Sequence, residues 1–130
     1  MGAEEVGGED WRTPLTAAAA RYGTPCYVMR WQPVAEAVAS LDRLTTRSLV
    51  VRSWLSFKTH PVVPLLRQWL QSGRGVEVVS ECELVTALAA GADAADLLVN
   101  GVAKHAWLPR YDLPGLRVHI DSPGELQSLM

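Results

Sequence analysis

Four short apolar segments, each followed by an amphipathic segment, are the feature that most constrains how this chain can fold. They begin near Leu49, Val76, Leu97 and Arg117, so successive segments start 27, 21 and 20 residues apart. That spacing accommodates one strand, one helix and two loops, and strands that alternate with helices in this way form a parallel sheet with right-handed crossovers. The sequence therefore predicts an α/β fold with about four β/α units in residues 48–130.

A repeated motif marks the junction between strand and helix in two of these units. Residues 77–84, EVVSECEL, align with residues 119–126, HIDSPGEL, at a displacement of 42 residues. Both copies place Ser-x-x-Glu directly after a strand, which is a capping box: the serine accepts from the amide three residues on, and the glutamate reaches back to the cap amide. The repeat is typical of a (β/α) barrel and is also compatible with an open doubly wound sheet.

The length of the chain limits how much of a barrel it can form. A complete (β/α)8 TIM-type barrel takes about 250 residues, whereas this chain has 130. Half a barrel leaves its end strands unpaired, which is unfavourable in water. We therefore expect a partial barrel and a truncated or partial chain.

The first 47 residues differ in character from the rest. Residues 1–11 are rich in Gly and Glu and are predicted to form a disordered acidic tail. Residues 12–47 are predicted to lead into the barrel with a helix capped by Thr13, a short strand at 26–30 (CYVMR) and a second helix at 31–44.

Composition excludes several classes of protein. With 48% hydrophobic and 20% charged residues, the chain is too apolar to be disordered, and it has no apolar run near the roughly 18 residues that a membrane span needs. Its acidic N-terminus is neither a secretory signal nor a transit peptide. A net charge of −2 without a basic stripe argues against nucleic-acid binding. Cys26 and Cys82 form no disulfide framework or metal motif, so we expect no metal site and a cytoplasmic location.

Lys58 stands at the end of the first predicted strand, where the catalytic groups of β/α barrels gather. Alternation along the strand places it with Ser56 and Trp54, and in the barrel mouth if Phe57 faces the helices. A lysine that is partly desolvated there has a lowered pKa and can form an imine with an aldehyde. A lysine that ends a strand and extends into solvent is the alternative.

Four motifs in a fixed order carry a resemblance to a known family. They are YGTPCYV (22–28), SFKTHP (56–61), GVEVVSECEL (75–84) and DSPGEL (121–126). The series resembles the fold-type III pyridoxal-phosphate decarboxylases, the group that contains diaminopimelate, ornithine and arginine decarboxylases. The resemblance runs from about Leu15 to Met130 but covers only the front third or so of a family member.

The resemblance implies a cofactor, a substrate class and site residues. Lys58 matches the catalytic lysine that binds pyridoxal 5′-phosphate as an internal aldimine, and Glu77 matches an acidic position near that lysine. Glu77 paired with a neighbouring base is the alternative for that residue. The substrate would be an amino acid, full-length members would form homodimers, and residues 26–30 would be the strand that the family contributes to a separate β-domain.

The chain also departs from the family pattern. His60 replaces the usual Asn, and NGVAKH (100–105) resembles a Gly-Asn-x-Lys loop in which Lys104 is interpreted as a solvated residue. Nothing resembles the glycine-rich loop for the cofactor phosphate, so we expect the chain alone to bind the cofactor poorly. Alternatives are an alanine-racemase-like or pyridoxal-phosphate-homeostasis barrel protein, or a non-catalytic half-barrel module.

Overall fold

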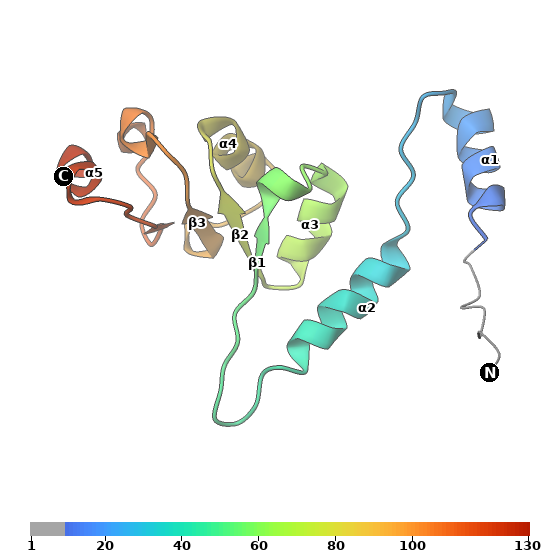
Figure 1. Ribbon diagram of the computed structural model, residues 1–130, viewed down its shortest axis with the longest axis horizontal. Helices are drawn as coiled ribbons and strands as arrows, with labels where there is room; N and C mark the ends of the chain where they lie inside the picture. The colour runs from blue at the N-terminus through green and yellow to red at the C-terminus, as the bar shows by residue number, and fades with distance from the viewer. Residues whose placement is uncertain (1–9) are drawn as a thin grey trace, which may run out of the picture. The chain divides into compact units, whose positions relative to one another are not determined.

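A computed structural model of the protein describes residues 10–130 (Figure 1). Most of the tail predicted to be disordered, residues 1–9, lies outside the described residues. The chain divides into two compact units, Met1–Thr45 and Thr46–Met130. The predicted β/α units all fall in the second.

The first unit contains two helices, α1 (Arg12–Tyr22) and α2 (Trp31–Asp42). Thr13 does not cap α1, contrary to the sequence prediction. The Asp10 carboxylate takes that place, since it accepts from the Arg12 amide at 3.0 Å and from the Thr13 hydroxyl at 3.4 Å. An ionised carboxylate is a stronger acceptor than a hydroxyl for the free amides of a first turn.

The strand predicted at residues 26–30 is absent from the structure. These residues are irregular, and no strand among residues 10–130 pairs with them. A β-prone segment needs a neighbouring ladder to become a strand, so the β-rich composition of CYVMR is not sufficient by itself. The assignment of this segment to a separate β-domain stays a prediction.

The second unit contains a parallel four-stranded sheet in the order β1-β2-β3-β4. The strands are β1 (Trp54–Ser56), β2 (Gly75–Val78), β3 (Leu97–Val99) and β4 (Arg117–Val118). This confirms the predicted α/β fold with four parallel strands. Each strand lies beside its predecessor in the chain, a progression that is compatible with part of a barrel.

The first strand is shorter than predicted. The sequence indicated a strand over residues 48–57, whereas β1 begins at Trp54. Trp54 is paired with Gly75, the first residue of β2, and β2 offers no residue before it. The ladder therefore cannot extend back over residues 48–53, although these residues are apolar enough for a strand.

Three helices follow the first, second and fourth strands: α3 (Val63–Gln71), α4 (Glu81–Ala89) and α5 (Pro123–Leu129). Figure 1 shows α3 and α4 beside the strands that they connect. Val76 and Val78 of β2 and Leu97 and Val99 of β3 are fully buried, as are residues of α3 and α4. Glu77 and Leu98, which lie between them along the strands, are half-buried. The core consists of side chains from both layers, among them Leu66, Val76, Val78, Leu84, Ala87, Leu97 and Val99.

Both predicted capping boxes are present. The Ser80 hydroxyl accepts from the Glu83 amide at 3.3 Å, and the Ser122 hydroxyl accepts from the Glu125 amide at 3.1 Å. Each glutamate also accepts a backbone N–H at 2.9 Å, from Val79 or Asp121. In both copies this amide belongs to the residue before the cap serine, one position earlier than the sequence analysis expected.

Candidate active site

The C-terminal ends of the four strands lie together, because all four are parallel; we call this the carboxyl end of the sheet. The hydrogen-bond ladder continues one residue beyond β3 and β4, where the amides of Asn100 and His119 donate to Val78 and Val99 at 2.9 Å. Lys58, Asn100 and His119 therefore follow three strands at the same end. In β/α barrels this end carries the functional groups.

Lys58 lies in a single 3₁₀ turn, Phe57–Thr59, that follows β1 directly. The turn is closed by the Thr59 hydroxyl, which donates to the Ser56 carbonyl at 2.7 Å, and by the His60 amide, which donates to Phe57 at 3.1 Å. Phe57 is buried, whereas Lys58 and His60 are exposed. The buried phenyl ring anchors the turn, and the lysine next to it projects into solvent.

This geometry corrects one step of the sequence analysis. Strand alternation was expected to extend to Lys58 and to leave it partly desolvated. The strand ends at Ser56, so a two-residue period no longer applies at Lys58, and the lysine is exposed. Among residues 10–130 its ammonium has no hydrogen-bond or ion-pair partner.

Glu77 lies in the middle of β2, opposite Ser56 of β1 in the register. The Ser56 hydroxyl donates to Oε1 of Glu77 at 3.1 Å. The carboxylate thus has a neutral hydroxyl as its partner rather than the base considered as an alternative. Ser56 and Glu77 belong to the half-buried set of sheet residues, and Lys58 follows Ser56 by two positions.

Lys104 is the most unexpected residue at the carboxyl end of the sheet. It was interpreted as a solvated loop residue, but its side chain is 0% exposed. Its ammonium donates to the Gly101 carbonyl at 2.7 Å and forms ion pairs with Glu125 at 2.7 Å and Asp121 at 3.2 Å. These acceptors match the three N–H groups of a lysine, which explains how a buried charge is tolerated there.

The ion pair between Lys104 and Glu125 contributes to a shift in the pKa of each residue. Burial acts to lower the pKa of Lys104, but the hydrogen bonds with Glu125 and Asp121 outweigh it and the pKa is raised. The Asp121 amide, followed by Lys104, holds the pKa of Glu125 below its ordinary value. Lys104 is therefore a permanently protonated amine near neutral pH and is not a nucleophile.

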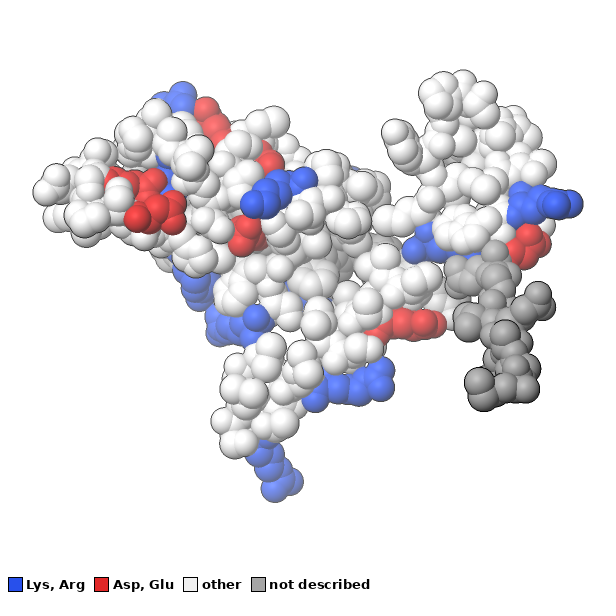
Figure 2. Space-filling view, in the orientation of Figure 1, with Lys and Arg blue, Asp and Glu red and all other residues white. Residues whose placement is uncertain are grey.

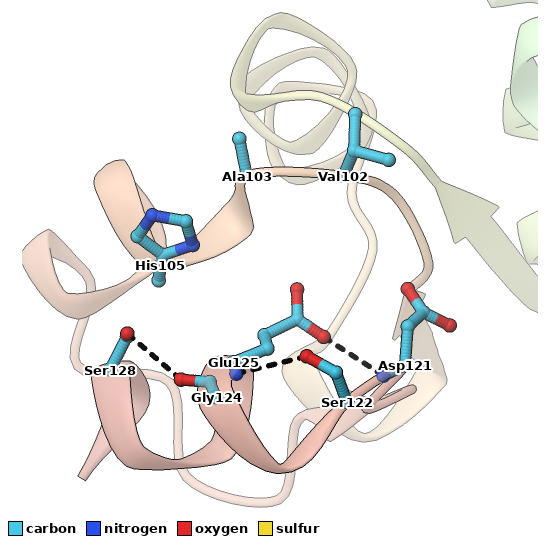
Figure 3. Close-up of a pocket in the computed structure, with 8 residues that line it drawn as sticks. All are labelled: Val102, Ala103, His105, Asp121, Ser122, Gly124, Glu125 and Ser128. Atoms are coloured by element: carbon cyan, nitrogen blue, oxygen red, sulfur yellow. Dashed lines mark hydrogen bonds between the residues drawn. The ribbon is translucent and has the colours of Figure 1, made fainter.

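A pocket of about 300 Å³ lies between the loop after β3 and the start of α5. Figure 3 shows His105 on one side of this pocket, with Asp121, Ser122 and Glu125 on the other. Asp121 is well exposed, with 62% of its side chain accessible, whereas the Glu125 side chain is 10% exposed. Only the Asp121 carboxylate is therefore readily reached from solvent.

A second cluster ties the 3₁₀ turn Leu108–Arg110 to the start of α4. Glu81, the first residue of α4, accepts from the Tyr111 hydroxyl at 2.6 Å and from Arg110 at 2.7 Å. The hydrogen bond to Glu81 is the main cause of a raised pKa of Tyr111.

A metal-binding cluster and a membrane-spanning helix are both absent from residues 10–130. These residues bring no three His, Cys, Asp or Glu side chains together as a metal site would require. None of their helices has both the length and the apolar character of a membrane span. On the face drawn in Figure 2, acidic and basic side chains occur in small groups among uncharged ones.

The assignment of Lys58 and Glu77 to a cofactor site stays a prediction, whereas the burial of Lys104 was not expected from the sequence. A signal was available in the paired carboxylates of the DSPGEL motif, Asp121 and Glu125, which lie one β/α unit after Lys104. Their convergence on one ammonium depends on the fold of the loop, and so required the structure.

These features describe an α/β protein with a barrel-like run of parallel strands and an accessible lysine at its carboxyl end. No protein-family model matches the chain. Two diaminopimelate decarboxylases are similar to it. The one from Zymomonas mobilis is 32% identical over 120 residues, which is 89% of this chain and 28% of that protein. The one from Deinococcus radiodurans is 38% identical over 93 residues, 72% of this chain and 24% of that protein.

The chain therefore spans about a quarter of the length of the curated relatives that it matches. Their names agree with the resemblance to the decarboxylases stated from the motifs. They support a relationship between this chain and the decarboxylases.

Proposed function

We propose that this chain is part of a pyridoxal-phosphate-dependent amino-acid decarboxylase of the diaminopimelate type and that it holds the cofactor through the amine of Lys58. The similarity to two diaminopimelate decarboxylases supports the reaction class and favours it over the racemase-like and non-catalytic alternatives. We further propose a cytoplasmic enzyme that acts on an amino acid and assembles as a homodimer in its full-length form.

The observation that carries this proposal is the difference between the two lysines of the chain. An aldehyde requires an amine that is accessible and can lose its proton. Lys58 is exposed and free of partners among the described residues, while Lys104 is buried and donates to three acceptors. Lys58 is therefore the lysine that fits the aldehyde of the cofactor.

The remaining residues have roles that follow from their positions. When bound, pyridoxal phosphate supplies an electron sink for the carbanion that is left as carbon dioxide departs. The 3₁₀ turn, anchored by Phe57, holds the Lys58 amine at the carboxyl end of the sheet. Ser56 orients Glu77 through Oε1 and leaves Oε2 without a partner among the described residues. That oxygen is available to hold a proton or a nearby ammonium.

The test is to locate the amine that pyridoxal phosphate labels. The whole chain is incubated with limiting cofactor, reduced with borohydride to make the attachment irreversible, and digested for mass spectrometry. An α-amino group has a pKa near 8, well below that of an ordinary lysine near 10.4, so labelling without a binding site would favour the N-terminus. We expect label on Lys58 in preference to the N-terminus, and its loss in Lys58→Arg.

Borohydride trapping also detects weak reversible binding, which matters because the chain alone is expected to bind the cofactor poorly. Lys104 serves as an internal control and should remain unlabelled while the chain is folded. Label that is confined to the N-terminus, or that appears equally on both lysines, would contradict the proposal.

A further inference from the structure

The loop from Asn100 to His105, which follows β3, has a backbone that few sequences can adopt. A Cβ atom on Gly101 would lie 2.4 Å from the carbonyl oxygen of Val79, so only glycine fits against that backbone. Ala103 has a φ of 56°, in the left-handed region that non-glycine residues seldom occupy. Such conformations persist only where the surrounding structure holds them, and they gather at functional sites.

Lys104 supplies the contacts that hold this loop. Its ammonium closes the loop on itself through the Gly101 carbonyl and ties it to the residues after β4 through Asp121 and Glu125. One buried charge thus joins the third and fourth β/α units at the carboxyl end of the sheet. A buried ion pair with all its hydrogen bonds made specifies one geometry more strictly than apolar packing does.

The repeat within the chain shows that this tie is not required for helix capping. Glu83 and Glu125 occupy the same position of the two capping boxes and make the same backbone bonds. Glu125 alone has a lysine on its other oxygen. The Lys104–Glu125 pair is therefore an addition to the second copy, and the segment that it fixes is the loop.

We infer that Lys104 is a positioning residue that fixes the Asn100–His105 loop against the start of α5, at the end of the sheet where Lys58 lies. The inference rests on the proposed function in that it assigns the fixed loop to the surroundings of the cofactor. The loop also forms one wall of the pocket in Figure 3, through Val102, Ala103 and His105. Losing the Lys104–Glu125 pair should therefore loosen this wall.

The test compares Glu125→Gln with Glu83→Gln in the whole chain. Glutamine can replace glutamate in a capping box, so both variants keep their helix starts, and only the first loses an ion pair. We expect amide hydrogen exchange in residues 100–106 to become about tenfold faster in Glu125→Gln, as the loss of one charge-assisted hydrogen bond would produce. It should be unchanged in Glu83→Gln, and exchange in β2 should be unchanged in both.

A second measurement separates positioning of the cofactor from stiffening of the loop. Labelling of Lys58 by pyridoxal phosphate is compared with its reductive methylation by formaldehyde, which reports the intrinsic reactivity of the amine. In Glu125→Gln, labelling by pyridoxal phosphate should fall severalfold while methylation stays the same, and Glu83→Gln should change neither. Should Glu125→Gln not fold, Asp121→Asn removes the longer ion pair and takes its place.

Each result decides the inference. Loop exchange in Glu125→Gln within about twofold of the parent chain would overturn it, since the pair would then not hold the loop closed. Faster loop exchange with unchanged labelling would overturn the positioning role. Absence of selective Lys58 labelling in the parent chain would refute the proposed function and the cofactor role of the loop with it. In that event the difference in loop hydrogen exchange between Glu125→Gln and Glu83→Gln still decides whether Lys104 fixes the loop.

Discussion

Nζ of Lys104 lies 2.7 Å from Oε1 of Glu125, and the lysine is completely buried. The same glutamate accepts the Asp121 amide through its other oxygen, so one carboxylate both caps α5 and neutralises a buried ammonium. Removing the charge at either residue leaves polar atoms of the other without a partner. Removing one partner of such a pair therefore destabilises the fold by more than the intact pair stabilises it.

Replacement of Lys104 by Met should lower the free energy of unfolding by about 2 kcal/mol, because the Gly101 carbonyl and the Glu125 carboxylate, whose side chain is 10% exposed, lose their donor. The matched control is Lys58→Met, which alters an exposed side chain and should stay within about 0.5 kcal/mol. Urea unfolding followed by circular dichroism measures both. Equal effects of the two substitutions would contradict the buried geometry of Lys104.

The pair also predicts how stability depends on pH. The folded state lowers the pKa of Glu125 from its ordinary 4.5, so the contribution of this group is present above pH 4.5 and is lost as the pH falls through the folded value. The folded state raises the pKa of Lys104 from its ordinary 10.5. The lysine contribution is therefore complete below pH 10.5 and is lost as the pH rises through the folded value.

Urea unfolding of the parent chain and Glu125→Gln across the acid range measures this dependence. The free energy of unfolding of the parent should decline below about pH 4.5 more steeply than that of the variant. Glu83→Gln provides the comparison for loss of an equivalent carboxylate that has no lysine partner. An acid limb of the same slope in the parent and in Glu125→Gln would show that the ion pair does not contribute.

Regular spacing made most of the second unit predictable. Three strand starts and the two capping boxes follow from local patterns: β2 begins at Gly75, beside the predicted Val76, and α4 begins at Glu81, directly after the first capping serine. The extent of β1 was not predictable in this way, because it depends on where the neighbouring strand begins. For the same reason a β-prone segment at residues 26–30, with no strand beside it, did not form one.

The site was predictable where sequence position alone determines it. Lys58 follows a strand, and any lysine that does so lies at the carboxyl end of a parallel sheet. Its exposure depended on the 3₁₀ turn, which breaks the alternation from which its direction was inferred. Burial of Lys104 depended on three acceptors brought together by separate segments, and no spacing rule anticipates such a convergence.

The close approach of Gly101 to the Val79 carbonyl predicts an asymmetry between two glycines. Gly101→Ala places a Cβ atom 2.4 Å from a backbone oxygen, which cannot move as a side chain could, and should destabilise the protein by about 1–3 kcal/mol. Gly124 lies in α5, and a Cβ atom there would have its closest contact at 4.0 Å, with the Ser122 hydroxyl. Gly124→Ala should therefore be neutral or stabilise the protein by up to about 1 kcal/mol. Thermal unfolding of both variants checks this, and a neutral Gly101→Ala would refute the loop geometry.

The contact between Glu81 and Tyr111 predicts opposite effects of two neighbouring substitutions on one phenol. The hydrogen bond to Glu81, then burial and the charge of Glu81, raise the pKa of Tyr111, while the charge of Arg110 lowers it. Glu81→Gln should therefore shift ionisation of Tyr111 to lower pH, and Arg110→Gln should shift it to higher pH.

Phenolate absorbance measures this ionisation in a background that carries Tyr22→Phe and Tyr27→Phe, so that Tyr111 is the sole tyrosine. Circular dichroism at each pH ensures that only the folded chain is compared. Shifts of the same sign in the two variants would mean that Glu81 and Arg110 do not act on Tyr111 as the 2.6 Å and 2.7 Å contacts require.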